Sequence, residues 1–476
     1  MLFNSIEFLI FFPLVTTLYF LVTPRWRWLL LLIASCVFYM AWIPVYVLIL
    51  FLIIGIDYVA AQKIEVSQGT ARKTWLGLSI FANVSILALF KYYNFLCENL
   101  NGVFHTLNFS YQIPALNLIL PIGLSFHTFQ ALAYTIEVYK GKQVAEKHLG
   151  IYALYVMFYP QLVAGPIERP QHLIHQFKEE HKFDDKRMAS GLRLMLWGLF
   201  KKVVIADRLA ILVNQVYGSP QEYSGLPLLI ATYCFAYQIY CDFSGYTDIA
   251  IGAARVLGID LVTNFRSPYS ATSVQEFWHR WHISLSTWFR DYLYVPLGGS
   301  RIGQLGKIRN ILIVFFVSGL WHGASWTFAQ WGLLHGLYMI IYLGWRQLPD
   351  QSRALLKVPV LGRFIGIFLT FNAVCFAWIF FRATTTQDAL WIATHLLPLN
   401  NADLIPKLGL TGGEMLVALV SILILEIVQF VDRNYGGQAV LDKMRLSVRW
   451  AGYYVLILII SLLGEFGGQR FLYFQF

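Results

Sequence analysis

Two clusters of histidines, about forty residues apart, stand out because both lie among strongly apolar residues. The first cluster reads Glu276-Phe-Trp-His279-Arg280-Trp-His282-Ile-Ser284-Leu-Ser286. The second reads Ser318-Gly-Leu-Trp-His322-Gly-Ala-Ser325. Ionisable side chains at membrane depth cost free energy, so by default they mark a transport pathway or a reaction centre. A basic loop joins the two clusters, and together they suggest chemistry rather than architecture.

His322 follows an apolar run and has Ser318 one turn earlier on the same helical face. Gly319 and Gly323 flank it and allow another backbone to approach closely. A neutral imidazole in such a pocket can take a proton from a hydroxyl, provided that a neighbour fixes its tautomer. The alternative is a core histidine that hydrogen-bonds to a backbone carbonyl.

Glu276, His279 and His282 are spaced by three residues and would share one face of a helix. This pattern has three interpretations: an active-site role for His282, a structural helix at the membrane interface, or a metal site. No distant set of further ligands is identifiable, so we expect no metal. Arg280 and Arg290 would face water or an anionic group, and Trp278 and Trp281 would flank the histidines.

Further polar residues interrupt the apolar segment near 226–254, namely Asp242, Ser244, Tyr246 and Asp248. Buried carboxylates are retained when they are paired or hydrogen-bonded. These residues could orient the histidines, relay protons in a transporter, or pair with Arg255 or Arg266 as a structural lock. Of the other histidines, we expect His127 to pack in the interior or line a tunnel. His172 and His175 should be solvated in a charged loop.

The composition indicates a polytopic membrane protein. The 476 residues are 58% hydrophobic and 13% charged, whereas soluble chains are about a quarter charged. The net charge of +10 is explained by basic loops on one side of the membrane and gives no case for nucleic-acid binding. The five cysteines lack a CxxC spacing and are interpreted as reduced packing residues.

A membrane span needs about 20 apolar residues. We expect an all-α fold of one domain over residues 1–476, with roughly eleven transmembrane helices and one or two re-entrant or interfacial helices. The candidate segments are 4–22, 27–43, 45–61, 75–97, 115–138, 149–165, 189–217, 226–254, 309–321, 324–345, 364–382, 414–431 and 448–464. Segment 149–165 contains Pro160 and ends at Gly165, which predicts a broken helix.

The distribution of lysine and arginine predicts the orientation. Alternate loops after the first, third and fifth segments are basic, which places them in the cytoplasm and the N-terminus outside. The loop 255–309 carries seven arginines and lysines and should be cytoplasmic as well. We find no cleavable signal peptide and expect a multi-pass protein of the bacterial inner membrane.

Several motifs together resemble the membrane-bound O-acyltransferase family. Within it, the chain is most similar to the bacterial branch with the membrane subunits for alginate O-acetylation and for D-alanyl transfer to teichoic acid. The resemblance covers nearly the whole chain. It rests on the N-terminal start Met1-Leu-Phe-Asn-Ser-Ile-Glu-Phe-Leu, Leu120-Pro-Ile-Gly-Leu-Ser-Phe-His-Thr-Phe-Gln, Gln161-Leu-Val-Ala-Gly-Pro-Ile-Glu-Arg-Pro, Tyr240-Cys-Asp-Phe-Ser-Gly-Tyr-Thr-Asp, Phe277-Trp-His-Arg-Trp-His-Ile-Ser-Leu-Ser and Leu320-Trp-His-Gly-Ala.

This resemblance implies that His322 is the catalytic histidine inside the membrane and that His282 is the second histidine of the bacterial branch. It also implies a ring of helices around a thin centre with a tunnel, in which donor and acceptor meet from opposite sides. A partner periplasmic or extracellular acyltransferase of the serine-histidine hydrolase type would serve the acceptor.

We therefore expect an O-acetyltransferase that moves acetyl from a cytoplasmic thioester, acetyl-CoA, toward an extracellular or periplasmic polysaccharide such as alginate. Arg280, Arg290 and Arg301 would attract the donor's phosphates. Trp281, Ser318 and Asp242 are further candidates for binding substrate or donor, and no bound cofactor is expected. The alternatives are transfer of D-alanyl or another acyl group to a cell-wall polymer, a proton-coupled transporter, and a scaffold for a polysaccharide synthase. GxSxG, P-loop and GxGxxG motifs are absent from the sequence.

Overall fold

The computed structural model describes residues 1–163, 165–349, 359–466 and 471–472, and these residues form helices, turns and loops without a strand. They divide into two compact units. The first unit comprises residues 1–195 and 249–262, and the second comprises residues 196–248 and 263–476. The all-α fold class is confirmed, and the single domain stays a prediction.

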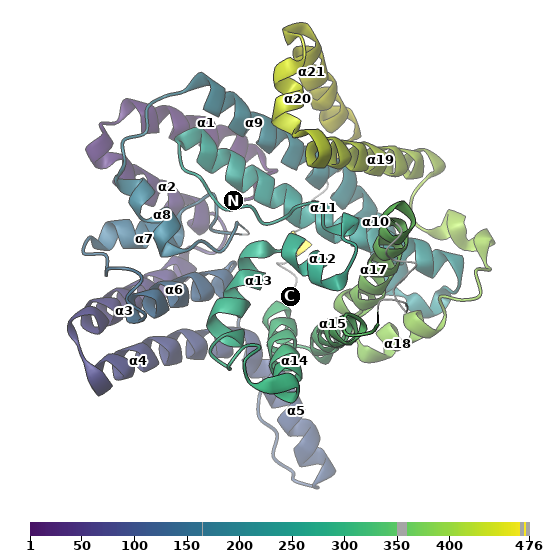
Figure 1. Cartoon of the computed structure of the whole chain (residues 1–476), viewed down its shortest axis with the longest axis horizontal. Helices are drawn as coiled ribbons and strands as arrows, with labels where there is room; N and C mark the ends of the chain where they lie inside the picture. The colour runs from purple at the N-terminus through teal and green to yellow at the C-terminus, as the bar shows by residue number, and fades with distance from the viewer. Residues whose placement is uncertain (164, 350–358, 467–470, 473–476) are drawn as a thin grey trace. The chain divides into compact units, whose positions relative to one another are not determined.

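Helices of the first unit run from the N-terminus to the middle of the chain (Figure 1). They are α1 (Ile6–Leu21), α2 (Arg27–Met40), α3 (Val47–Val66), α4 (Gly69–Leu87), α5 (Tyr93–Thr106), α6 (Leu124–Tyr139), α7 (Leu149–Met157), α8 (Pro170–Leu173) and the first residues of α9 (Asp185–Leu199). The predicted segment 115–138 is wrong at its start, because the chain is irregular until α6 begins at Leu124. Pro114 and Pro121 account for this, since proline disfavours helix at the residue before it.

A buried polar cluster joins three helices of the first unit. Asp57 of α3 accepts hydrogen bonds from Ser79 Oγ (2.5 Å) and Asn83 Nδ2 (2.9 Å), both on α4. Ser79 also donates to Thr135 of α6 at 3.1 Å. A buried carboxylate needs such donors, so these bonds fix how α3, α4 and α6 pack together.

Helices of the second unit carry both histidine clusters. They are α10 (Asp207–Gly218), most of α11 (Leu226–Leu257), α12 (Val274–Arg280), α13 (Ile283–Phe289), α14 (Gly303–His322), α15 (Trp326–Trp345), α17 (Pro359–Arg382), α18 (Thr386–Thr394), α19 (Gly412–Tyr435), α20 (Gly437–Lys443) and α21 (Leu446–Leu463). A π-helical segment at Phe200–Ala206 leads into α10. The predicted span 309–321 forms part of α14, which is longer because it begins in the basic loop.

α14 packs closely against α15 (Figure 1). His322, the last residue of α14, is buried. A Cβ at Gly319 would lie 2.2 Å from the carbonyl oxygen of Phe328, and one at Gly332 would lie 2.2 Å from that of Phe315. Only glycine permits this approach, as the glycine beside His322 predicted. The last turn of α14, which ends in His322, is thereby fixed against its neighbour.

Five helical segments among the described residues are long and apolar enough to cross a membrane. They are Pro44–Val66, Gly69–Thr106, Val360–Arg382, Gly412–Tyr435 and Leu446–Leu463. The expected count of roughly eleven stays a prediction. The break in segment 149–165 is confirmed, because α7 ends at Met157 and the residues up to Val163 form turns.

Candidate active site

His282 occupies a sharp break between two short helices. Its φ and ψ are 42° and 55°, a left-handed conformation that is uncommon for a residue with a Cβ. α12 ends at Arg280, and α13 begins at Ile283. The prediction that Glu276, His279 and His282 share one helical face is therefore wrong, because the break rotates His282 away from the pattern of α12.

Asn264 holds the backbone directly after this break. The carbonyl oxygen of Asn264 accepts a hydrogen bond from the amide of Ile283 at 3.0 Å. Its side-chain Oδ1 accepts from the amide (3.1 Å) and hydroxyl (2.8 Å) of Ser284. A left-handed residue persists where its surroundings determine it, and Asn264, itself fully buried, supplies that constraint.

The two predicted histidines, His282 and His322, lie next to one another in the structure. Their ring centres are 6.3 Å apart, and both side chains are buried. Groups that act in one reaction centre must lie close together, and this pair meets that condition. His322 also lies 4.9 Å from Trp321, 5.0 Å from Trp331 and 5.4 Å from Phe381, measured between ring centres.

Aromatic rings surround His282 as well. The ring of Phe243 stands edge-on to it at 4.6 Å, and Trp321 lies at 6.1 Å. Burial lowers the pKa of His282 to about 3, because the imidazolium form would lose its hydration. His282 is therefore neutral at physiological pH, and it can take part in hydrogen bonds without carrying a charge.

A cavity of about 390 Å³ lies beside the histidines in the second unit. Polar, basic and apolar side chains line it. The lining residues are Gln275, Trp278, His279, Ile283, Leu285, Ser286, Thr287, Phe289, Arg290, Tyr294, Ser300, Lys307, Ile311, Val314, Phe315, Ser318, Met339 and Leu343. His279 and Arg290 are exposed, whereas Leu285 and Ser318 are buried, so the cavity runs from a basic, solvated side to an apolar, enclosed one.

The enclosed side of this cavity is next in sequence to both histidines. Ile283 follows His282 directly, and Ser318 stands one turn before His322 on α14. Neither His282 nor His322 is among the lining residues that the structure describes. Trp278, Phe289 and Phe315 supply aromatic side chains to the lining. The continuous tunnel to His322 stays a prediction.

The other predicted substrate residues divide into two groups. Arg290 and Ser318 line the cavity. Arg280 instead forms an ion pair with Glu276 (2.5 Å) and donates to Ser270 Oγ at 2.8 Å. Trp281 is fully buried and stacks on Phe277 with ring centres 5.5 Å apart. Both therefore have structural contacts, and their predicted role in donor binding stays a prediction.

Asp242 belongs to a buried network of charges whose lysine members were not predicted from the sequence. Its Oδ1 lies 2.7 Å from Lys202 Nζ, which also contacts Asp207 Oδ1 at 2.8 Å. Lys201 pairs with Asp248 at 2.6 Å. The predicted partners Arg255 and Arg266 were wrong, since lysines take their place. The adjacent lysines within the apolar segment 189–217 were the available signal, because such charges are expensive unless paired.

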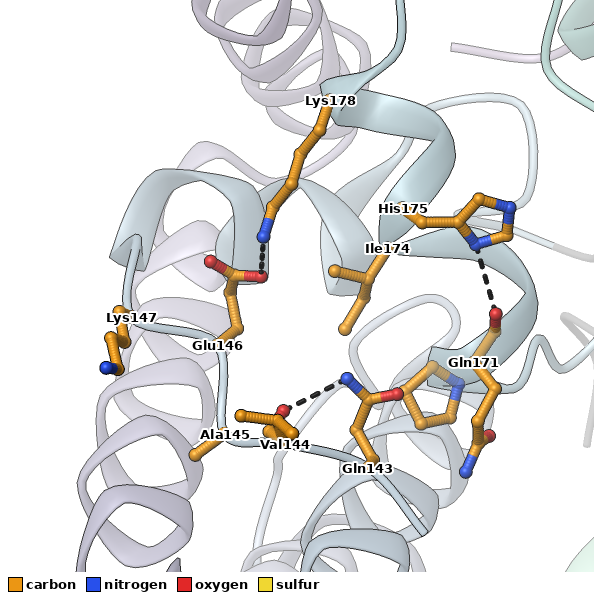
Figure 2. Close-up of a pocket in the computed structure, with 10 residues that line it drawn as sticks. Gln143, Val144, Ala145, Glu146, Lys147, Gln171, Ile174, His175 and Lys178 are labelled. Atoms are coloured by element: carbon orange, nitrogen blue, oxygen red, sulfur yellow. Dashed lines mark hydrogen bonds and ion pairs between the residues drawn. The ribbon is translucent and has the colours of Figure 1, made fainter.

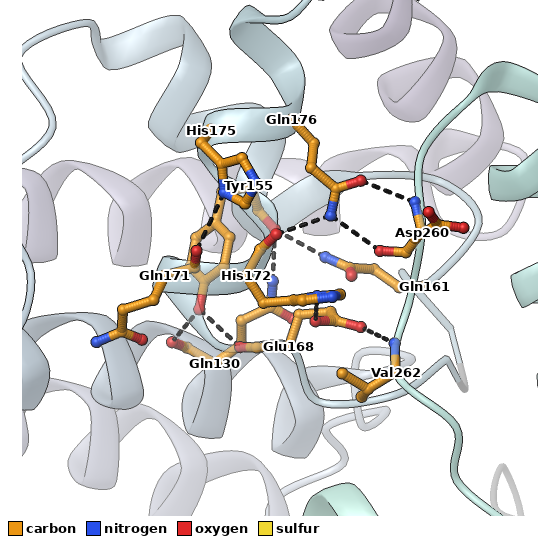
Figure 3. Close-up of polar contacts among 10 residues, drawn as sticks. All are labelled: Gln130, Tyr155, Gln161, Glu168, Gln171, His172, His175, Gln176, Asp260 and Val262. Atoms are coloured by element: carbon orange, nitrogen blue, oxygen red, sulfur yellow. Dashed lines mark hydrogen bonds and ion pairs between the residues drawn. The ribbon is translucent and has the colours of Figure 1, made fainter.

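In the first unit, Glu168 is the centre of a separate polar network (Figure 3). Its carboxylate accepts from the amide of Val262 at 2.6 Å and contacts His172 Nδ1 at 2.8 Å. Gln176 makes a pair of bonds to the backbone of Asp260, at 2.8 and 3.0 Å. The hydrogen bond to Glu168 raises the pKa of His172. We predicted that His172 is solvated. It is only partly so, because the fully buried carboxylate of Glu168 binds it.

A second cavity, of about 320 Å³, lies in the first unit beside this network (Figure 2). Lys178 and Glu146 form an ion pair of 2.6 Å there. His175 contacts the carbonyl oxygen of Gln171 at 3.1 Å, and its side chain is mostly exposed, which confirms that prediction. His127 is buried and packs near Tyr39 with ring centres 6.2 Å apart, as expected of a packing residue.

Comparison with known proteins identifies the family. Residues 73–381, which include both histidines of the site, match the model of the membrane-bound O-acyltransferase family. The chain is 34% identical to the probable alginate O-acetylase AlgI of Pseudomonas putida over the full length of both proteins. It is 36% identical to the peptidoglycan O-acetyltransferase of Helicobacter pylori over 80% of this chain and 76% of that protein.

A more distant relative broadens the range of acyl groups. The teichoic acid D-alanyltransferase of Streptococcus thermophilus is 28% identical over 55% of this chain and 68% of that protein. The family match covers more than half of the chain, and the relatives named for O-acetyl transfer align with most of it. The chain is a multi-pass membrane acyltransferase and belongs to the membrane-bound O-acyltransferase family.

Proposed function

We propose that this protein is a membrane O-acetyltransferase that moves an acetyl group from acetyl-CoA toward a hydroxyl of a polysaccharide outside the cytoplasm. The observation that carries the proposal is the pair of buried imidazoles, with ring centres 6.3 Å apart, beside a cavity with one basic and one apolar side. Relatives named for alginate and peptidoglycan O-acetylation support the acetyl group and the polysaccharide acceptor.

The cavity matches the two chemical parts of an acyl-CoA. Arg290 and Lys307 would hold the phosphates, since cationic donors bind phosphate oxygens strongly. Asp291 lies 2.7 Å from Arg290 and offsets part of its charge, so Lys307 would contribute the larger attraction. The apolar wall, including Phe315 and Met339, would take the pantetheine arm and direct the thioester toward Ser318.

His322 would act as the general base. Its imidazole takes the proton of the acceptor hydroxyl while the hydroxyl oxygen attacks the thioester carbonyl carbon. The carbon–sulfur bond then breaks, the acetyl group stays on the oxygen as an ester, and the CoA thiolate leaves and takes up the proton. General-base catalysis contributes about 10²–10⁴-fold, and positioning of both substrates at near-attack distance contributes much of the rest.

His282 would assist on the donor side as a neutral imidazole. Burial keeps its pKa far below physiological pH, so it offers a lone pair or an N–H without a charge. The left-handed break and the clamp of Asn264 would hold this ring at a fixed distance from His322.

The loop 255–309 would lie in the cytoplasm of a bacterial inner membrane, with the N-terminus outside, because the basic loops alternate with the spans. A partner acyltransferase would complete transfer to the polysaccharide on the far side. A single cysteine in place of Arg301 should be labelled by an impermeant thiol reagent only from the cytoplasmic face. Labelling from outside would overturn the orientation and the donor side with it.

Activity of the purified protein tests the function. We expect release of free CoA from acetyl-CoA in the presence of an acceptor hydroxyl, and no release by His322→Ala. The exposed His105→Ala is the matched control and should keep wild-type activity. Preference for a D-alanyl thioester over acetyl-CoA would reassign the acyl group. Proton flux across proteoliposomes without thioester consumption would contradict acyl transfer.

A further inference from the structure

The C-terminal residues that the structure describes lie next to the candidate active site within the second unit. Phe471 and Leu472 are buried, with exposed fractions of 1% and 3%. The amide of Leu472 donates to Asp242 Oδ2 at 2.7 Å. Their burial is unlike the neighbouring Phe466, whose side chain is 58% exposed. Phe471 and Leu472 therefore belong to the interior of the second unit.

Charged groups bind the described residues near the C-terminus at two points. Upstream, Arg208 binds Glu465 Oε1 at 3.0 Å and the carbonyl oxygen of Leu463 at 2.6 Å. The amide of Glu465 donates to the carbonyl oxygen of Val203 at 2.8 Å. Downstream, Asp242 holds Leu472 while Lys202 holds Asp242. A carboxylate bound by both a lysine and a backbone amide has little freedom to move.

Phe471 connects this anchor to His282 through aromatic rings. Its ring lies 4.7 Å from that of Tyr246 and 5.9 Å from that of Phe243, measured between centres. Phe243, the residue after Asp242, stands edge-on to His282 at 4.6 Å and an interplanar angle of 84°. Rings in such edge contacts prefer defined geometries, so a shift of Phe471 moves Phe243 and then the imidazole.

We propose that Phe471, held in place through the Leu472–Asp242 hydrogen bond, is a positioning residue that sets the location of His282 through Phe243. The inference rests on the proposed role of His282 in acyl transfer. It gives the buried pair Lys202–Asp242 a task beyond stability, because that pair fixes both the C-terminal residues and the start of the aromatic path. The ring contacts lead from Phe471 to Phe243 and from Phe243 to His282.

The test compares Phe471→Ala with Phe466→Ala in the full-length protein, with acetyl-CoA as donor. A displacement of about 1 Å at a reacting group costs about 10²-fold, so Phe471→Ala should lower kcat about 10- to 100-fold and leave KM for acetyl-CoA within about two-fold. Phe466→Ala should match the wild type in both. Phe471→Leu, which keeps apolar volume without the ring, should recover part of the loss.

Two further measurements keep the inference falsifiable. If Phe471 acts through Phe243, the losses in Phe471→Ala and Phe243→Leu should not multiply in the double variant. If Phe471→Ala does not accumulate in the membrane, Phe471→Leu must still show the drop in kcat. Equal kcat per folded protein in Phe471→Leu and Phe466→Ala would overturn the inference. An active His322→Ala would instead overturn the proposed function, so the two failures are distinguishable.

Discussion

Two sites of this protein, one in each unit, place a histidine in opposite surroundings. In the first unit, His172 is partly exposed and contacts the buried carboxylate of Glu168 at 2.8 Å, which raises its pKa. In the second unit, His282 is enclosed by Phe243, Trp321 and His322, and burial lowers its pKa to about 3. One site favours the charged imidazole, and the other favours the neutral one.

This difference separates a structural histidine from a candidate catalytic one. The Glu168 network links the loop around His172 to the backbone of Val262 and needs a charge to complement its carboxylate (Figure 3). The aromatic surroundings of His282 and His322 bury both rings and keep at least His282 neutral. An imidazole can act as a general base only while it is unprotonated. Burial alone does not assign this role, since the packing residue His127 of the first unit is buried as well. The pairing of His282 with His322 beside the cavity is what points to chemistry in the second unit.

The largest expected effect comes from exchanging the histidines of the two sites for alanine. His322→Ala should lower the rate of acyl transfer by about 10²–10⁴-fold because the general base is lost. His172→Ala should stay within about three-fold of the wild type, since its hydrogen bond serves the fold. Initial rates of CoA release, normalised to folded protein from gel filtration, measure both. Comparable losses in the two variants would remove the distinction between the units.

A smaller effect, on KM for acetyl-CoA, should distinguish Arg290 and Lys307 of the cavity from Arg301 outside it. Arg290→Ala combined with Lys307→Ala should raise KM for acetyl-CoA about ten-fold with kcat nearly unchanged, because phosphate contacts bind ground and transition state alike. Arg301→Ala is the control, because Arg301 is exposed and is not among the described lining residues. A larger rise in KM for Arg301→Ala would move the donor site.

The pH dependence of stability should reveal His282. Its folded pKa is depressed, whereas an unfolded imidazole titrates near pH 6.5. As the pH falls below that value, the unfolded state binds a proton that the folded state does not, so stability decreases. His282→Phe should weaken this loss on the acid side. Thermal unfolding midpoints in detergent between about pH 4.5 and 6.5 check the sign, and an unchanged slope would contradict it.

The smallest effect is expected at His172, and it has the opposite sign. Its folded pKa is raised, so its contribution is fully present below the unfolded value near 6.5 and is lost as the pH rises through the folded pKa. Glu168→Gln should flatten the dependence of the unfolding midpoint on pH above about 6.5. A steeper dependence in this variant would show that another group titrates there.

Much of the fold follows from composition and apolar segments. The long helices α3, α17, α19 and α21 lie where apolar runs predicted spans. The interruption after α7 was predicted from Pro160 and Gly165. The start of α6 was not predicted, because the apolar segment 115–138 has the composition of a span, but Pro121 disfavours helix at the residue before it.

The candidate site was only partly predictable. Residue type and spacing pointed to His282 and His322, but the break between α12 and α13 depends on Asn264, which no local pattern marks. The pairing of Lys202 with Asp242 likewise depends on tertiary packing and not on a local sequence pattern. Lys201 and Lys202, adjacent in an apolar segment, were not used in the prediction; they could have indicated buried carboxylate partners, but not which ones. The catalytic roles of both histidines stay predictions.

A double-variant cycle tests most directly whether His282 and His322 form one reaction centre. The rates of acyl transfer would be measured for His282→Ala, His322→Ala and the double variant. Residues that act as a unit give losses that do not multiply. We predict that the double variant is within about three-fold of His322→Ala alone. Losses that multiply, or a single variant with wild-type activity, would contradict a shared centre.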